Sequence, residues 1–142
     1  MKPASTVYRV ITAAIVFTVT LGSPAVRAGG DPTGVWQVED KSAIVQIEPC
    51  GPALCGTIIW SEKPTDAKGE TLCNMAVLGD AVPSGPDRWD KGWVYAPKAG
   101  SKYPVSLELA GDDTLHLHIT AGLFGRDQTL TRPMVKVAPC SP

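Results

Sequence analysis

The sequence predicts an all-β protein, a small antiparallel up-and-down β-barrel that follows an amino-terminal signal peptide. Apolar and polar residues alternate along most of the chain after residue 29, which is typical of strands with one buried face. Turn-forming residues recur at intervals of roughly 8 to 15 residues, and helical periodicity is almost absent. A half-open sandwich would also bury these faces, but a closed barrel leaves no strand edge exposed.

The first 28 residues have the pattern of a cleavable signal peptide. Lys2 and Arg9 are followed by an uncharged run over residues 10–21, and small side chains precede the expected cleavage site after Ala28. The apolar run of about 12 residues is too short to cross a bilayer as a helix, which needs about 20. We therefore expect residues 1–28 to be removed, so that residues 29–142 form a single barrel domain exported from the cytoplasm.

Export changes the charge of the chain. Loss of Lys2, Arg9 and Arg27 takes the 13 basic residues to 10, against 14 acidic ones, so the mature domain has a net charge of about −4. It has no basic stripe of the kind that binds phosphate backbones. Nucleic acid and anionic membrane surfaces are therefore not expected partners, and the sequence leaves the oligomeric state open.

Seven or eight short strands are expected in order along the mature chain. The alternating runs are residues 34–38, 45–48, 57–60, 93–95, 105–109, 115–119 and 127–132. Between them lie turn signals such as Pro97 to Gly100 and Gly111-Asp112-Asp113. The pattern is weakest over residues 65–88, where we expect a long mobile loop.

The four cysteines, Cys50, Cys55, Cys73 and Cys140, all lie in the mature part of the chain. An even number in a small exported domain predicts disulfides, and four cysteines allow three pairings. Cys50 and Cys55 flank a turn-forming Gly51-Pro52 segment, so we favour this pair across a hairpin. Cys73 would then pair with Cys140. A metal or redox site is disfavoured, because the chain contains neither Cys-x-x-Cys nor His-x-x-His.

Motifs in a fixed order resemble the exported bacterial proteins of domain-of-unknown-function family 2147. The residues that carry the resemblance are Gly34-Val35-Trp36, Cys50-Gly51, Leu54-Cys55-Gly56, Trp60, Pro64-Thr65-Asp66, Gly69, Trp89 to Gly92, Tyr95-Ala96-Pro97, Gly100, Tyr103 and Gln128 to Arg132. The resemblance implies a lipocalin-type (calycin) barrel and export to a bacterial periplasm or beyond, and it implies no particular activity.

Trp36 and Arg132 are expected to meet where the first and last strands of a barrel close. A guanidinium can lie on an indole ring while it donates to main-chain carbonyls at the barrel end. The alternative is that Arg132 binds the anionic head group of a ligand.

Large aromatic rings are candidates for the wall of a ligand pocket, although they also suit a packed core. We take Trp93 and Tyr95, two apart on one strand, as the first choices. The full set of candidate ligand-binding residues is Trp36, Trp60, Trp93, Tyr95, Tyr103 and Arg132.

No catalytic constellation, metal site or cofactor motif is found in the sequence. His116 and His118 are expected to point to solvent, because Leu115, Leu117 and Ile119 occupy the opposite face. Asp66 is expected to bond backbone amides of the following turn. The leading function is binding of a small, partly apolar ligand inside the barrel. The alternative is a structural or protein-interaction module of the cell envelope with a fully packed barrel, and a hydrolase or isomerase built on Asp66 ranks third.

Overall fold

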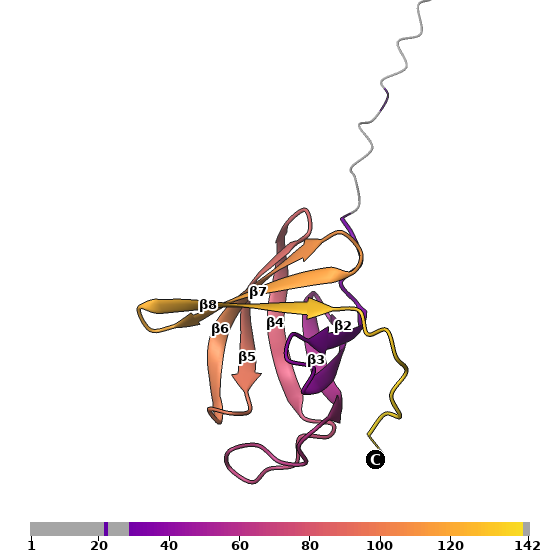
Figure 1. The fold of residues 1–142 in the computed structure, drawn as a ribbon. Helices are drawn as coiled ribbons and strands as arrows, with labels where there is room; N and C mark the ends of the chain where they lie inside the picture. Colours follow the sequence, from indigo (N-terminus) through magenta and orange to yellow (C-terminus); the bar gives the residue numbers. More distant parts are fainter. Residues whose placement is uncertain (1–21, 23–28, 141–142) are drawn as a thin grey trace, which may run out of the picture.

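The computed structural model describes residue 22 and residues 29–140, and the predicted signal peptide, residues 1–28, lies outside this range except for Gly22. Eight strands follow one another along the chain (Figure 1). They are β1 (Gly34–Val38), β2 (Ala43–Cys50), β3 (Ala53–Ser61), β4 (Ala76–Gly85), β5 (Arg88–Ala96), β6 (Ser101–Ala110), β7 (Thr114–Ala121) and β8 (Phe124–Thr131).

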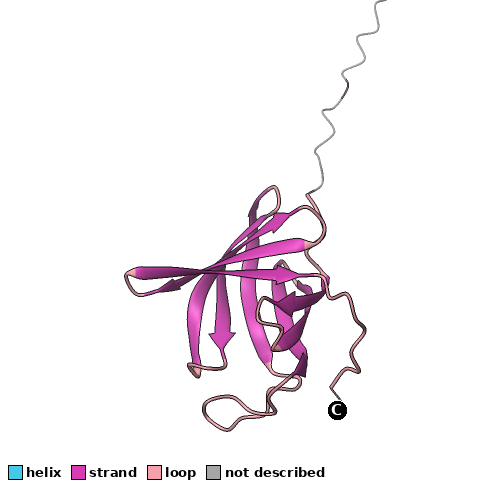
Figure 2. Ribbon diagram, in the orientation of Figure 1, coloured by secondary structure: helices cyan, strands magenta, loops and turns pink. Residues whose placement is uncertain are grey.

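Each strand pairs antiparallel with the next, and β8 returns to β1, so the sheet closes into an up-and-down barrel. This confirms the all-β barrel that the alternation predicts. Figure 2 shows only strands and connecting loops in the described part of the chain. Within that part, no helix is long and apolar enough to cross a membrane.

The expectation of a long loop over residues 65–88 is wrong, because β4 occupies Ala76–Gly85. Strict alternation fails in this strand: Val77, Leu78 and Gly79 are all buried, and Asp80 has a positive φ of 58°. An irregularity of this kind removes the period of two on which strand prediction depends. The connection between β3 and β4 is correspondingly shorter and covers residues 62–75.

The up-and-down order places alternate loops at opposite ends of the barrel. The loops after β1, β3, β5 and β7 lie at one end, which we call the open end. The loops after β2, β4 and β6 lie at the other end, together with residues 29–33 that precede β1, and we call this the closed end. This arrangement determines which loops surround the candidate site.

The half of the barrel next to the closed end is filled with side chains. Trp36 is fully buried there, and Trp89 is 8% exposed. These two rings pack in the core cluster with six aliphatic residues, namely Leu54, Ala81, Val105, Leu107, Leu109 and Leu115. The two large rings fill the space that the aliphatic side chains do not occupy, so this half of the barrel is a packed hydrophobic core.

Both disulfides have the predicted pairing. Cys50 bonds Cys55 across the β2–β3 hairpin, and Cys73 bonds Cys140, with Cα atoms 5.7 and 5.5 Å apart. The second bond attaches the carboxy-terminal tail to the end of the β3–β4 loop. The Cys140 amide also donates to the Ile59 carbonyl at 2.6 Å, which places the tail along the outside of β3 (Figure 1).

Candidate ligand cavity

The half of the barrel next to the open end is hollow. It contains a cavity of about 990 Å³. Its inner wall is aliphatic and consists of Val45, Ile47, Ile58, Leu72, Val77, Leu78, Val94, Leu117, Ile119 and Leu130. Tyr103, Gln128 and Arg126 pair with inward-facing residues and also line the cavity, but all three are partly or fully exposed. The interior can therefore hold an apolar group without leaving a buried charge unpaired.

Polar and charged residues form the rim of the cavity. On one side Lys98, in the β5–β6 loop, donates to Asp40 in the β1–β2 loop at 3.0 Å. Hydrogen bonds from the Ser42 hydroxyl and amide, and then the one from Lys98, lower the pKa of Asp40 to about 2. Asp40 is therefore an anion throughout the physiological range, and it links two rim loops.

The β3–β4 loop lies over part of the open end. Asp66 accepts hydrogen bonds from the Lys68 and Glu70 amides, each at 2.8 Å, as the turn expected at this position requires. The Tyr95 hydroxyl donates a further hydrogen bond to Asp66. The Ala67 amide donates to the Pro97 carbonyl at 3.0 Å, so the loop is attached to the β5–β6 hairpin at two points.

The Tyr95–Asp66 hydrogen bond shifts the pKa values of both residues. The bond from Tyr95 is the largest cause of the lowered pKa of Asp66, followed among the favourable contacts by the Glu70 and Lys68 amides. The acceptor carboxylate raises the pKa of Tyr95 to about 12. Across the neutral range Tyr95 is therefore a neutral donor and Asp66 a charged acceptor, and both oxygens of Asp66 accept hydrogen bonds, one from Tyr95 and the other from two loop amides.

Leu72 connects this loop to the interior. Its side chain is 6% exposed, belongs to the core cluster and lines the cavity, although it lies in no strand. The next residue, Cys73, is fixed to the carboxy-terminal tail by its disulfide. The loop thus contributes an apolar side chain to the cavity wall and is held at both its tip and its end.

The closed end is sealed by Trp36 and Arg132, as expected from the first and last strands of a barrel. The Arg132 guanidinium lies 3.7 Å from the centre of the Trp36 ring. Its nitrogens also donate to the carbonyls of Val35, Asp112 and Asp31 at 3.2 to 3.3 Å. Each of the three guanidinium nitrogens therefore donates a hydrogen bond, and neither Trp36 nor Arg132 lines the cavity.

Two of the six candidate ligand-binding residues, Tyr95 and Tyr103, line the cavity. Trp36 and Arg132 lie at the closed end instead. Trp60 and Trp93 do not line the cavity either, so the expectation that Trp93 is a first-choice wall residue disagrees with the structure.

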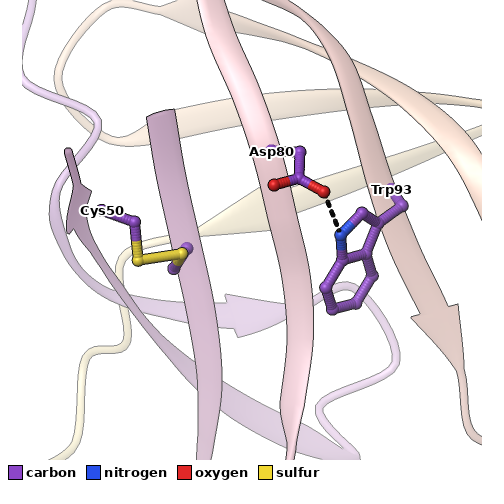
Figure 3. Close-up of a disulfide and its surroundings, with 4 residues drawn as sticks. Cys50, Asp80 and Trp93 are labelled. Carbon is purple, nitrogen blue, oxygen red and sulfur yellow. Dashed lines mark hydrogen bonds between the residues drawn. A yellow bond between two sulfur atoms is a disulfide. The ribbon is translucent and has the colours of Figure 1, made fainter. Parts of the chain in front are cut away.

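Figure 3 shows Trp93 beside Asp80, to which its indole nitrogen donates at 2.9 Å. The Lys102 ammonium lies 3.8 Å over the same ring, on the solvent side of the barrel.

β-bulges explain why Trp60 and Trp93 point outward. The ladder pairs Trp89 with Leu107 but Gly92 with Val105, so β5 has one extra residue, and Lys91 there has a φ of 62°. An extra residue exchanges the two faces of the strand beyond it. Val94 therefore faces the cavity where strict alternation from Trp89 would place Trp93.

The same exchange occurs in β3. Val45 pairs with Ile58, whereas Ile44 pairs with Trp60, so Ile59 is the extra residue. Trp60 then shares the outer face with Ile44 and is only half-buried.

The two histidines contact β8. The Nδ1 atom of His118 lies 2.5 Å from Asp127 Oδ1, and that of His116 lies 3.3 Å from the Thr129 hydroxyl. His118 is exposed, in line with the expected outward orientation. In the described residues, no three His, Cys, Asp or Glu side chains are grouped so that they could hold a metal ion.

Sequence reasoning missed two parts of the site. The aliphatic wall residues are not among the six candidates, although the alternation of residues such as Leu117 and Ile119 is visible in the sequence. Arg126, which pairs with Ile119 in the ladder and lines the cavity, carries no motif. Its only signal was its position opposite an inward-facing residue, and that depends on strand register.

An eight-stranded up-and-down barrel with one sealed end and one hollow, open end is the architecture of a lipocalin-like protein. A solved structure of a Helicobacter pylori protein, described as belonging to the lipocalin family, is similar to this chain with a TM-score of 0.62. The likeness covers 72% of this chain and 83% of that one at 17% identity, so it establishes the fold alone.

The chain belongs to the family described as "Uncharacterized protein conserved in bacteria (DUF2147)", whose model matches residues 34–132. That range runs from the start of β1 to Arg132, the residue that seals the closed end. A comparison with curated proteins gave no match.

Proposed function

We propose that the protein binds a small, partly apolar molecule in the cavity at the open end of its barrel. The observation that carries the proposal is the aliphatic cavity of about 990 Å³, in a barrel whose other half is tightly filled. Natural ligand pockets have volumes of roughly 300 to 1,000 Å³ and apolar walls with a few polar groups near the entrance. The inner wall and the polar rim described above fit this pattern.

The alternative, a structural or interaction module with a fully packed barrel, is less well supported. A solid barrel would continue the packing of the closed half, where Trp36 and Trp89 fill the interior. In the open half the buried positions are aliphatic, Tyr103 and Gln128 are only partly buried, and the large rings Trp60 and Trp93 face away from the cavity.

We propose binding without catalysis. Asp66, the carboxylate considered for a hydrolase or isomerase, is occupied by Tyr95 and by two backbone amides. His118 is paired with Asp127, away from the aliphatic wall. A general acid or base needs a group that can reach the proton it transfers, and both of these groups are engaged elsewhere.

We also propose that the protein acts outside the cytoplasm. Two disulfides persist in oxidising compartments, and the family is bacterial, which together support a periplasmic or secreted protein. Ligands of the cell envelope are then the first candidates to test.

Native mass spectrometry of gently purified protein, followed by a thermal-shift screen of fatty acids, isoprenoids and aromatic metabolites, tests the proposal directly. We expect either a co-purified molecule or at least one compound that raises the melting temperature, because a ligand that binds only the native state stabilises it. Failure of both would favour the interaction module.

A pair of neighbouring substitutions tests where the ligand binds. Val94→Phe places a ring in the cavity, and we expect it to weaken binding roughly tenfold or more, because the added volume displaces the ligand. Trp93→Ala changes the adjacent residue on the outer face and should leave ligand affinity unchanged. Isothermal titration measures both, and circular dichroism checks that each variant is folded. Equal affinities for Val94→Phe and the wild type would exclude this cavity.

A further inference from the structure

The turn between β7 and β8 exposes two large apolar side chains. Leu123 is 100% exposed and Phe124 is 81% exposed, while the preceding Gly122 adopts a positive φ of 62° in a two-residue turn. Large apolar side chains at a turn are unfavourable in water, and nothing in the turn geometry requires them. We call residues 121–126 the hairpin tip.

The hairpin tip stands away from the barrel wall. Pairing between β7 and β6 ends at Ile119, and pairing between β8 and β1 begins only at Leu130. Residues between these points pair only within the hairpin, which therefore leaves the barrel as a two-stranded ribbon (Figure 1). The tip presents Leu123 and Phe124 to the surroundings without burying them against the domain.

The chemistry of the tip is that of a membrane interface. Stable protein–protein interfaces bury about 800 Å² and 20 or more residues on each partner, which two side chains at a narrow turn do not provide. Binding to a bilayer surface strengthens with the apolar area that is buried, so two large apolar side chains are enough for weak, reversible insertion. Arg126, two residues from Phe124 in β8, is also exposed.

We propose that the hairpin tip inserts reversibly into the surface of a lipid bilayer, with Leu123 and Phe124 among the acyl chains. Ala121 and Arg126, on either side of these residues, line the cavity. Insertion would therefore bring one side of the cavity rim to the membrane surface. The proposed contact is peripheral, because only the side chains of the hairpin tip enter the bilayer.

The driving force for insertion is apolar burial and not charge attraction. The mature domain is acidic overall, and the Arg126 cation is followed directly by the Asp127 carboxylate. Binding should therefore depend only weakly on the fraction of anionic lipid and on salt, unlike binding through a polybasic patch.

Flotation with vesicles tests the proposal on the mature protein. We expect it to float with vesicles of phosphatidylethanolamine and phosphatidylglycerol, and also with pure phosphatidylcholine. The Leu123→Ser, Phe124→Ser double variant should lower the bound fraction at least roughly tenfold, since it removes both inserted side chains.

The carboxy-terminal tail offers a matched control. Met134 and Val135 are also exposed, at 100% and 64%, and they follow β8 at the closed end. Met134→Ser, Val135→Ser should bind vesicles as the wild type does. If this variant loses binding to the same extent as the tip variant, exposed apolar residues act non-specifically and the proposal fails.

A tryptophan reporter locates the inserted side chain. With brominated phospholipids, Phe124→Trp should show more fluorescence quenching than the wild type. Val135→Trp should show no more quenching than the wild type. The proposal would be overturned if the wild type did not bind vesicles. It would also be overturned if the wild type self-associated and the tip substitution abolished this, because the tip would then make protein contacts. Vesicle binding and ligand binding are measured in separate experiments, so failure of one proposal does not decide the other.

Discussion

At the scale of single residues, Arg132 shows how one side chain can close a barrel. It stacks on Trp36 from β1 and donates to carbonyls in three different segments of the chain. Gly34 is needed beside it, because its φ of 105° disfavours other residues and a Cβ atom would lie 3.0 Å from the guanidinium. The three residues form one unit at the closed end.

Loss of the guanidinium should destabilise the fold. For Arg132→Met we expect the free energy of unfolding to fall by about 2 to 4 kcal/mol, because a cation–π contact and several hydrogen bonds are lost together. Arg132→Lys should recover only part of this, since an ammonium cannot reproduce the planar fork. Urea denaturation measures both variants, and a lysine variant as stable as the wild type would show that the carbonyl contacts are dispensable.

The hydrogen bond between Tyr95 and Asp66 predicts a specific dependence of stability on pH. Tyr95 has a folded-state pKa raised from 10.0 to about 12, so its contribution is complete below pH 10 and is lost as the pH rises through about 12. Asp66 has a pKa lowered from 3.8, so its contribution is present above that value and is lost as the pH falls through the lowered pKa.

Tyr95→Phe should therefore melt a few degrees below the wild type at neutral pH, with the difference shrinking at both extremes of pH. Thermal melts followed by circular dichroism across the pH range measure this difference. Tyr103→Phe is the matched control, because the Tyr103 hydroxyl makes no hydrogen bond to the described residues. A Tyr95→Phe difference that does not change with pH would contradict the assigned coupling.

At the scale of elements, β-bulges decide which aromatic residues face the cavity. One extra residue in β3 and one in β5 turn Trp60 and Trp93 outward, and the aliphatic neighbours Ile58 and Val94 face inward. A hollow interior in the open half follows from these two irregularities, because two indole rings that could occupy it are on the outside.

The two disulfides should contribute unequally to stability. Cys73–Cys140 joins residues 67 apart in the sequence, whereas Cys50–Cys55 joins residues 5 apart. Because the entropy of the unfolded chain falls further when a longer loop is closed, Cys73→Ser, Cys140→Ser should cost about 2 kcal/mol more than Cys50→Ser, Cys55→Ser.

Guanidinium denaturation of the two double variants measures this difference. Intact mass of the wild type with and without reductant should differ by the mass of four hydrogen atoms, in agreement with two disulfides and no free thiol. Equal losses of stability in the two double variants would show that native contacts of the tail or the hairpin outweigh the loop entropy.

At the scale of the whole molecule, the barrel is divided into a filled half and a hollow half, and the chain enters at the filled end. Residues 29–33 run across this end before β1. The Gly30 amide donates to Asp87 in the β4–β5 turn at 2.5 Å, and the Trp36 indole donates to the Pro32 carbonyl at 2.8 Å. The segment that follows the predicted cleavage site is therefore part of the folded domain.

Processing after Ala28 should leave Gly29 as the first residue of the exported protein. This would keep the Gly30–Asp87 contact and remove only residues that precede the closed end. Amino-terminal sequencing of protein recovered from the periplasm or the medium of a producing bacterium measures the processing site. Recovery of the full-length chain from the cytoplasm alone would contradict the export proposal.

The sequence by itself predicted the strand-rich barrel, favoured one of three disulfide pairings, and favoured the Trp36–Arg132 closure over ligand binding by Arg132. These features depend on local alternation, on cysteines that flank a turn, and on the adjacency of first and last strands in any closed barrel. The tertiary structure alone decided the position of β4, the inward residues of β3 and β5, and the place of Leu72 and Arg126 in the cavity wall. The strand residues depend on register, and a single bulged residue reverses the faces of a strand without leaving a clear signal in composition or periodicity. Leu72 lies in a loop, and only the tertiary fold places that loop over the cavity.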